Sequence, residues 1–172
     1  MKEEYAIVLD YNPTEGVVYA VGTKFFTLLK LKPKPDAVIA PLEKVYVGPG
    51  KRDKIQYIIK RLKYDELTDF AKEQLEKAIE QIVKEREKEF VEFFNMAGPI
   101  TLRLHSLELF EGIGKKTVNE IISEREREKF KSFEDIEKRI PKLKNIVKII
   151  AKRILDELRC KDKYHLFTSR FC

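Results

Sequence analysis

Two glycines separated by one apolar residue, Gly112-Ile113-Gly114, stand directly before two lysines, Lys115 and Lys116. Glycine permits a tight turn and the close approach of a ligand, because it has no Cβ. The first amides of a following helix have no intrahelical partner and carry the positive end of the helix dipole, so they favour an anion. The segment therefore predicts a phosphate-binding turn, in which the lysines add positive charge and Ile113 plugs into the core.

Apolar residues flank this turn on both sides. We expect the stretch before it to be helical, with Leu102, Leu104, Leu107, Leu109 and Phe110 as its apolar residues. A second helix opens with Thr117 and places Val118, Ile121 and Ile122 on one face. From Leu104 to about Arg125 the order of helix, glycine turn and helix resembles the helix-hairpin-helix motif. The resemblance implies contact with nucleic-acid phosphates at Gly112, Ile113, Gly114, Lys115, Lys116 and Thr117.

Proteins with this motif often carry two copies of it. Residues 130–136 are typical of the connector between copies, and Ser132 or Asp135 could cap the helix that follows. The second turn position, residues 139–145, lacks both glycines, and an apolar helix face follows over residues 146–158. We therefore expect one working turn and one mainly structural turn, where only side chains could reach a phosphate, namely those of Lys142, Lys144 and Lys148.

The first third of the chain predicts short strands separated by turn residues. Segments rich in β-favouring residues occur at 5–9, 17–21, 25–31, 38–40 and 45–47. Residues 54–63 fit both helical spacing and alternation. We favour a strand there, because closing a small barrel requires one more. The expected fold class is α+β, with a small N-terminal β-barrel or sandwich.

A helical pattern follows from about Leu67 to Met96, with Thr68 as its N-cap. A helix of that size would be roughly 45 Å long. Its apolar stripe is imperfect as a heptad repeat, so we favour a connecting helix over a dimer-forming coiled coil. The expected organisation is a small strand-rich barrel (1–64), a connecting helix (65–97), an all-α tandem helix-hairpin-helix domain (98–159) and a C-terminal tail (160–172).

A small barrel would offer a second binding surface. Small barrels of the OB-fold type hold single strands by stacking bases on aromatic side chains within a basic groove. For each aromatic residue, burial in the barrel core is the alternative. Phe25 and Phe26 are adjacent, so on a strand they would face opposite sides. The candidate contacts are Tyr19, Lys24, Phe25, Phe26, Lys30 and Tyr46.

The charge distribution fits a phosphate-binding protein. The net charge is +6, with 12 Lys/Arg against 7 Asp/Glu in residues 1–64, 5 against 10 in 65–95, and 18 against 12 in 96–172. Basic blocks attract phosphate, although a solvated surface gives the same pattern. Charged residues make up 37% of the chain and tryptophan is absent. That composition is thermophile-like, because charge desolvation costs less at high temperature.

We expect a binding protein rather than an enzyme, with no cofactor. Nucleophile-and-base patterns, phosphate loops and metal-ligand spacings do not occur, and His105 in its apolar stretch suits a structural role better than catalysis. Whether the scattered aspartates cluster around a metal stays open. Cys160 and Cys172 lack CxxC spacing, which argues against structural zinc and against a disulfide scaffold. Without a long apolar run or signal-peptide pattern, we expect a cytoplasmic protein with no membrane contact.

The whole chain also resembles an archaeal family of uncharacterised proteins, the domain of unknown function 655. Residues 60–68 and the glycine turn carry this resemblance. It implies that residues 1–64 form an OB-like β-barrel joined to the tandem helix-hairpin-helix domain, and an RNA-binding role.

Two hypotheses about function follow. The first is a non-catalytic protein that binds RNA or DNA through backbone phosphates. The second is a protein–protein adaptor in a nucleic-acid-processing complex, without direct nucleic-acid contact. The sequence leaves the type of nucleic acid and the oligomeric state open.

Overall fold

The computed structural model describes residues 2–172, whose contacts form two compact units. Unit 1 runs up to Ile79 and includes Ile154–Cys172, and unit 2 is Glu80–Arg153. The helices α1 (Asp69–Glu85) and α5 (Ile146–Leu158) each begin in one unit and end in the other. The C-terminal segment therefore belongs to the unit that contains the sheet.

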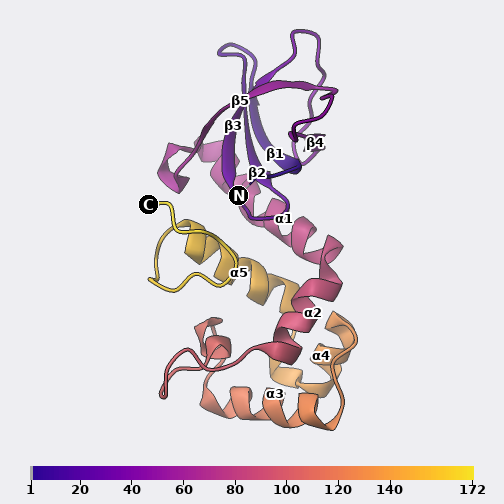
Figure 1. The fold of residues 1–172 in the computed structure, drawn as a ribbon, viewed down its shortest axis with the longest axis vertical. Coiled ribbons are helices and arrows are strands. Elements are labelled where there is room, and N and C mark those ends of the chain that lie inside the picture. The colour runs from indigo at the N-terminus through magenta and orange to yellow at the C-terminus, as the bar shows by residue number, and fades with distance from the viewer. Residues whose placement is uncertain (1) are drawn as a thin grey trace. The chain divides into compact units, whose positions relative to one another are not determined.

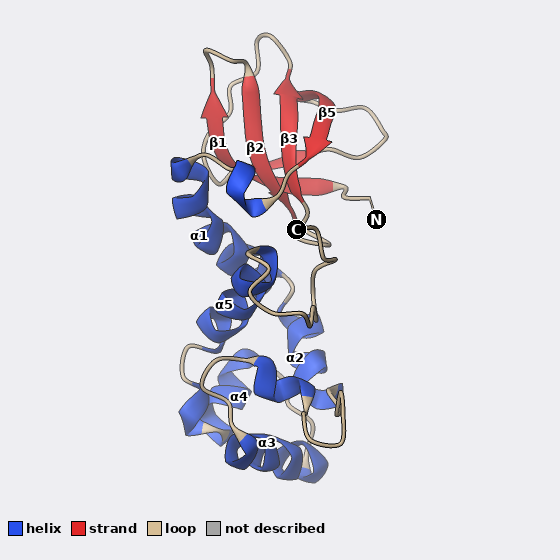
Figure 2. Cartoon of the chain, turned by 90° about the vertical axis from the view of Figure 1, so that its left-hand side faces the viewer, coloured by secondary structure: helices blue, strands red, loops and turns tan. Residues whose placement is uncertain are grey.

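Unit 1 contains a curled five-stranded antiparallel sheet with strand order β4-β1-β2-β3-β5 (Figures 1 and 2). The sequence correctly favoured a strand for the ambiguous segment at 54–63. The prediction of a strand at 38–40 was wrong, because those residues lie in an exposed loop where Val38 is 82% exposed. The strands are β1 (Tyr5–Asn12), β2 (Val17–Gly22), β3 (Leu28–Pro33), β4 (Lys44–Tyr46) and β5 (Ile55–Arg61).

Aliphatic side chains on one face of the sheet form its core. Period-two alternation places these residues on the same side of neighbouring strands. The guanidinium of Arg52 donates to the carbonyls of Val47, Gly48 and Gln56, so it links the end of β4 to β5. The buried cluster contains Ala6, Val8, Val18, Ala20, Leu29, Leu31, Val45, Val47 and Ile55.

The turn between β2 and β3 corrects the expectation of a strand beginning at Phe25. The carboxylate of Glu3 accepts the amides of Lys24, Phe25 and Thr27 at 2.9, 3.0 and 3.1 Å. Phe26 takes a positive φ of 56° and is 1% exposed. A carboxylate that receives three backbone amides stabilises a turn where β propensity alone favours a strand.

The long helix expected from Leu67 to Met96 is two helices, α1 and α2 (Glu87–Met96). At the break, the amide of Arg86 is shared between the carbonyls of Ile82 and Val83, at 3.0 and 3.2 Å. Such sharing tightens the end of a helix. Thr68 caps α1 as expected, since its Oγ1 accepts the amide of Ala71 at 3.0 Å.

Unit 2 packs short helices around α2 (Figure 1). The side chain of Asn95 both donates to and accepts from the backbone of Phe130, which fixes α2 to the connector before α4. Residues 102–110 are not the α-helix we expected, because a Pro99–His105 bridge and a 3-10 turn replace it. The remaining elements are the 3-10 helices η1 (Tyr64–Glu66, in unit 1), η2 (Ser106–Leu109) and η3 (Pro141–Leu143), with α3 (Lys115–Arg127) and α4 (Phe133–Arg139).

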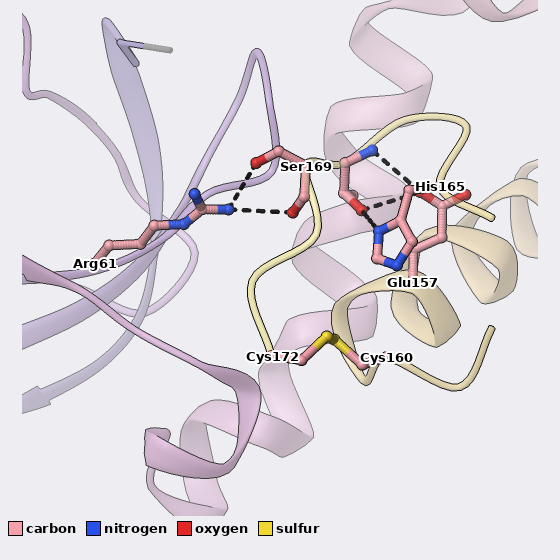
Figure 3. The surroundings of a disulfide bond; sticks show 7 residues. Arg61, Glu157, Cys160, His165, Ser169 and Cys172 are labelled. Atoms are coloured by element: carbon pink, nitrogen blue, oxygen red, sulfur yellow. Dashed lines mark hydrogen bonds between the residues drawn. A yellow bond between two sulfur atoms is a disulfide. The ribbon is translucent and has the colours of Figure 1, made fainter. Parts of the chain in front are cut away.

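The C-terminal tail packs back within unit 1 (Figure 3). The fully buried carboxylate of Glu157 accepts the amides of Leu166, Phe167 and Thr168. Arg61 donates to the carbonyl and the hydroxyl of Ser169 at 3.2 and 2.8 Å. A disulfide joins Cys160 and Cys172, a pairing that their spacing did not predict. Two lone cysteines thus close one loop rather than build a disulfide-rich scaffold.

Candidate nucleic-acid interface

The glycine turn, residues 111–114, connects η2 to α3. Gly112 has a positive φ of 85°, a conformation that L side chains rarely adopt. The amide of Ile113 donates to the carbonyl of Phe110 at 3.1 Å, and the Ile113 side chain is buried as expected. Gly114 is the N-cap of α3, with φ −101° and ψ −174°. The turn is therefore anchored by Ile113 and opens onto the first amides of α3.

The N-terminus of α3 differs from those of α1, α4 and α5. The N-cap of α2, Arg86, also makes no side-chain cap hydrogen bond, but Glu87 and Glu89 place acidic side chains in its first turn. A side-chain oxygen accepts an early amide in α1 from Thr68, in α4 from Ser132 and in α5 from Glu137. Gly114 offers no such oxygen to α3, whose first turn also contains no acidic residue. Unsatisfied amides at a helix start favour an anion. Among the described residues, α3 thus has no side-chain acceptor at the end where an anion would bind.

The fold does not require a glycine at position 114. Its backbone is extended, a conformation open to any residue. A Cβ built there meets nothing within 4 Å, as is also true at Gly112. Gly112 is explained by its positive φ, whereas Gly114 has neither a conformational nor a packing reason. The backbone at Gly114 is therefore open to the close approach of an external group.

The two lysines after the turn are in different situations. Both side chains are exposed, but the ammonium of Lys115 donates to the carbonyl of Arg103 at 2.8 Å and pairs with Glu108 at 3.2 Å. The amide of His105 and the ammonium of Lys115 hold the pKa of Glu108 below its usual range. Lys116 makes no hydrogen bond or ion pair with the part of the chain that the structure describes. It is the lysine available to an external anion.

Two predicted contact residues can act only through their backbone. The side chains of Ile113 and Thr117 are buried, the latter 1% exposed, so neither can touch a ligand. Glu111 also places an exposed carboxylate on the turn. The contact surface is therefore narrower than predicted: the glycines, the first amides of α3 and the lysine side chains.

The second turn, residues 140–145, has exposed lysines but a closed helix start. Asn145 has a positive φ of 57°, and a carboxylate oxygen of Glu137 accepts the amide of Ile146 at 3.0 Å. An internal carboxylate thus lies where the glycine turn leaves room for a phosphate. The side chains of Lys142, Lys144 and Lys148 are exposed, so the contact expected from them remains a prediction.

Replacing Glu137 by alanine is expected to lower the free energy of unfolding by about 1 kcal/mol, because it removes the acceptor at the start of α5. Thermal unfolding followed by circular dichroism measures this loss. Glu134→Ala is the matched control, because Glu134 lies on the same helix and, among the described residues, forms an exposed pair with Lys138 that contributes little to stability. Equal stability of the two variants would contradict the capping role.

The aromatic residues predicted for the sheet surface are partly buried. Tyr19 and Phe26 are 7% and 1% exposed, so their predicted role as base-stacking contacts is wrong. Burial raises the pKa of Tyr19, and the ammonium of Lys30 lies 5.9 Å from its ring. Phe25 remains half-buried, with the ammonium of Lys24 5.3 Å from its ring.

Tyr46 is also half-buried. It lies edge-on to Tyr5, with ring centroids 5.3 Å apart, and its hydroxyl accepts the amide of Gly50 at 3.1 Å. Phe25 and Tyr46, with the lysines Lys24 and Lys30, are therefore the predicted sheet contacts that keep exposed surface.

The histidines have structural partners. The Nδ1 of His105 accepts the amide of Leu107 at 3.1 Å, and burial, followed by the charge of Arg125, lowers the pKa of His105. His165 shares a hydrogen bond with Thr168 at 2.9 Å. Within residues 2–172, no three His, Cys, Asp or Glu side chains are grouped to hold a metal ion, and no helix is long and apolar enough to cross a membrane.

These features define a mixed α+β protein with a curled antiparallel sheet in one unit and a glycine turn before an uncapped helix in the other. Comparison with known proteins identifies its family. The family described as "Protein of unknown function (DUF655)" matches residues 2–169, and the chain belongs to this family. An uncharacterised protein of Methanocaldococcus jannaschii is 48% identical over 97% of this chain and 80% of its own length.

A solved structure is also similar. The crystal structure of a protein of the same family from Archaeoglobus fulgidus has a TM-score of 0.91 and 39% identity. The match covers 97% of this chain and all of that one. The archaeal family expected from the sequence is therefore confirmed.

Proposed function

We propose that this protein is a non-catalytic nucleic-acid-binding protein that holds a backbone phosphate at the start of α3, as a helix-hairpin-helix motif does. The observation that carries the proposal is the uncapped N-terminus of α3 beside Gly114, a glycine without a structural reason. A phosphate there would accept the first amides of α3 and approach a backbone that no Cβ shields.

The positive charge around the glycine turn supports a phosphate group as the bound anion. Lys116 is exposed and has no partner among the described residues, and the chain carries a net charge of +6. Contacts to phosphates carry no base information, so we expect binding that depends strongly on salt and little on sequence.

A weaker contribution from the sheet is part of the same proposal. The curled antiparallel sheet of unit 1, with the strand order β4-β1-β2-β3-β5, supports an OB-like barrel as the source of this contribution. The partly exposed Phe25 and Tyr46 would then contact a single strand by stacking. The glycine turn remains the principal contact.

Fluorescence anisotropy with single- and double-stranded RNA and DNA, at two or more salt concentrations, tests the proposal. Lys116→Ala is expected to weaken binding severalfold and to reduce the slope of log K against log salt by about 1, the effect of one lost phosphate contact. Lys138→Ala is the charge-matched control, because Lys138 forms an exposed pair with Glu134. It should bind like the wild type.

Two results would overturn the proposal. One is no binding by the wild type even at low salt, which would favour the adaptor hypothesis. The other is an equal effect of Lys116→Ala and Lys138→Ala, which would mean that only the total charge matters. Lys115→Ala is less informative, because it also breaks the contacts of Lys115 with Arg103 and Glu108.

A further inference from the structure

The segment before η2 presents a leucine that no described residue of unit 2 covers. Leu102 lies in a loop of residues 99–105, which we call the Leu102 loop, and its side chain is fully exposed, at 107%. Single exposed apolar residues are common on protein surfaces. Leu102 differs from them in how firmly it is held and in what lies next to it.

The Leu102 loop is fixed by hydrogen bonds on both sides of its tip. The hydroxyl of Thr101 accepts the amides of Arg103 and Leu104 at 3.2 and 3.0 Å. The carbonyl of Leu104 accepts the amides of Ile100 and Thr101 at 2.8 and 3.1 Å. The leucine at the tip is therefore held outward before any partner arrives, which lowers the entropic cost of binding.

The loop is also tied to the glycine turn. The ammonium of Lys115, the first residue of α3, donates to the carbonyl of Arg103 at 2.8 Å. A groove between the loop and α3 is lined by residues that include Leu102, Arg103, Lys115 and Asn119. The guanidinium of Arg103 has no partner among the described residues. The apolar tip thus lies beside the guanidinium of Arg103 and the Lys115–Glu108 pair, next to the helix start at which we place a phosphate.

We propose that Leu102 is a wedge that enters the base stack of a double-stranded nucleic acid, next to the phosphate bound at the glycine turn. The proposal rests on the proposed function. Apolar side chains of this kind insert between base steps in proteins that distort a duplex. Unstacking costs least at a mismatched step, so the wedge directs the protein to mismatched or bulged duplexes. The flanking guanidinium of Arg103, which has no partner among the described residues, favours this polyanionic partner over an apolar protein surface.

Duplexes that carry 2-aminopurine, either in a perfect context or beside a single mismatch, provide the test in both DNA and RNA form. The fluorescence of this base rises when it unstacks. The wild type should raise the fluorescence and prefer the mismatched duplex by about tenfold, the equivalent of about 1.4 kcal/mol. Leu102→Ala should lose the fluorescence rise and most of the preference, while it keeps the affinity and salt dependence of the wild type for the perfect duplex.

Val38→Ala is the matched control, because Val38 is also an exposed aliphatic residue in a loop. It should behave like the wild type in both measurements. An unchanged fluorescence rise and preference in Leu102→Ala would overturn the wedge and leave the phosphate contact intact. If the wild type binds no duplex, the proposed function itself fails. If Leu102→Ala changes only self-association in analytical ultracentrifugation, the leucine contacts protein and the wedge is wrong.

Discussion

Replacing Gly114 by aspartate is expected to weaken nucleic-acid binding by about a hundredfold and to raise the stability of unit 2 slightly. The extended backbone at this position suits an N-cap, and a Cβ meets nothing within 4 Å. The new carboxylate would accept the first amides of α3, which adds about 0.5 kcal/mol to the free energy of unfolding. It would also fill and repel the phosphate position, and losing charge-assisted hydrogen bonds costs about 2–3 kcal/mol of binding free energy.

Opposite changes in stability and affinity distinguish this effect from simple unfolding. Anisotropy titration measures the affinity, and thermal unfolding by circular dichroism measures the stability. Gly114→Asn supplies a neutral cap of similar size and should bind more tightly than Gly114→Asp. Gly112→Ala should instead lower stability by roughly 1–2 kcal/mol, because the φ of 85° at Gly112 disfavours a Cβ. Wild-type affinity in Gly114→Asp would rule out the start of α3 as the phosphate site.

Replacing Cys160 and Cys172 by serine is expected to lower the free energy of unfolding by about 3 kcal/mol. The disulfide joins residues separated by 12 positions, and the chain-entropy model gives about this value for a loop of that length. Cys160 has a positive φ of 56°, and serine would keep the same backbone strain. The difference therefore isolates the covalent bond. Denaturant unfolding with and without a reductant measures it.

Each single serine variant should lose as much stability as the double variant, because either change breaks the same bond. Reductant should lower the stability of the wild type to that of the variants and leave the variants unchanged. Phosphate binding at the glycine turn should not depend on the disulfide, since that proposed contact lies in unit 2. A wild-type protein that is insensitive to reductant would contradict the stabilising role of the bond.

Local chemistry in the sequence predicted much of the fold. The turn after β1 is an example, because Asn12 accepts the amides of Thr14 and Glu15, and Gly16 takes a positive φ of 64°. Residue types at neighbouring positions contain this information. The cap of Thr68 on α1 was predicted on the same basis.

Contacts between residues distant in sequence account for most of the errors. Glu3 stabilises a turn more than twenty residues away, and no local sequence pattern indicates that its carboxylate accepts the amides of that turn. The disulfide was missed because the spacing of Cys160 and Cys172 does not indicate that they meet. They meet because Glu157 accepts amides of the tail segment that lies between them in the sequence.

The candidate site was predicted in position but not in detail. Gly112 and Gly114 lie at a turn before a helix, as the spacing indicated. The pairing of Lys115 with Glu108 was not foreseen, although a separation of seven residues across a turn could have suggested it. The capping of α5 by Glu137 was also missed, because the sequence does not indicate that an acidic residue within one helix accepts a backbone amide of the following helix.

The carboxylate of Glu137 acts on α5 as a tethered competitor. Because it belongs to the same chain, its effective concentration at the start of α5 is on the order of millimolar or higher. A free phosphate group would have to displace it at that concentration, whereas the start of α3 has no such competitor. If the proposed function holds, each chain therefore binds a phosphate with its backbone amides at one helix start, that of α3, rather than at two. Tight occupancy of a long nucleic acid would then require several copies of the protein side by side, with a stoichiometry that rises with the length of the strand.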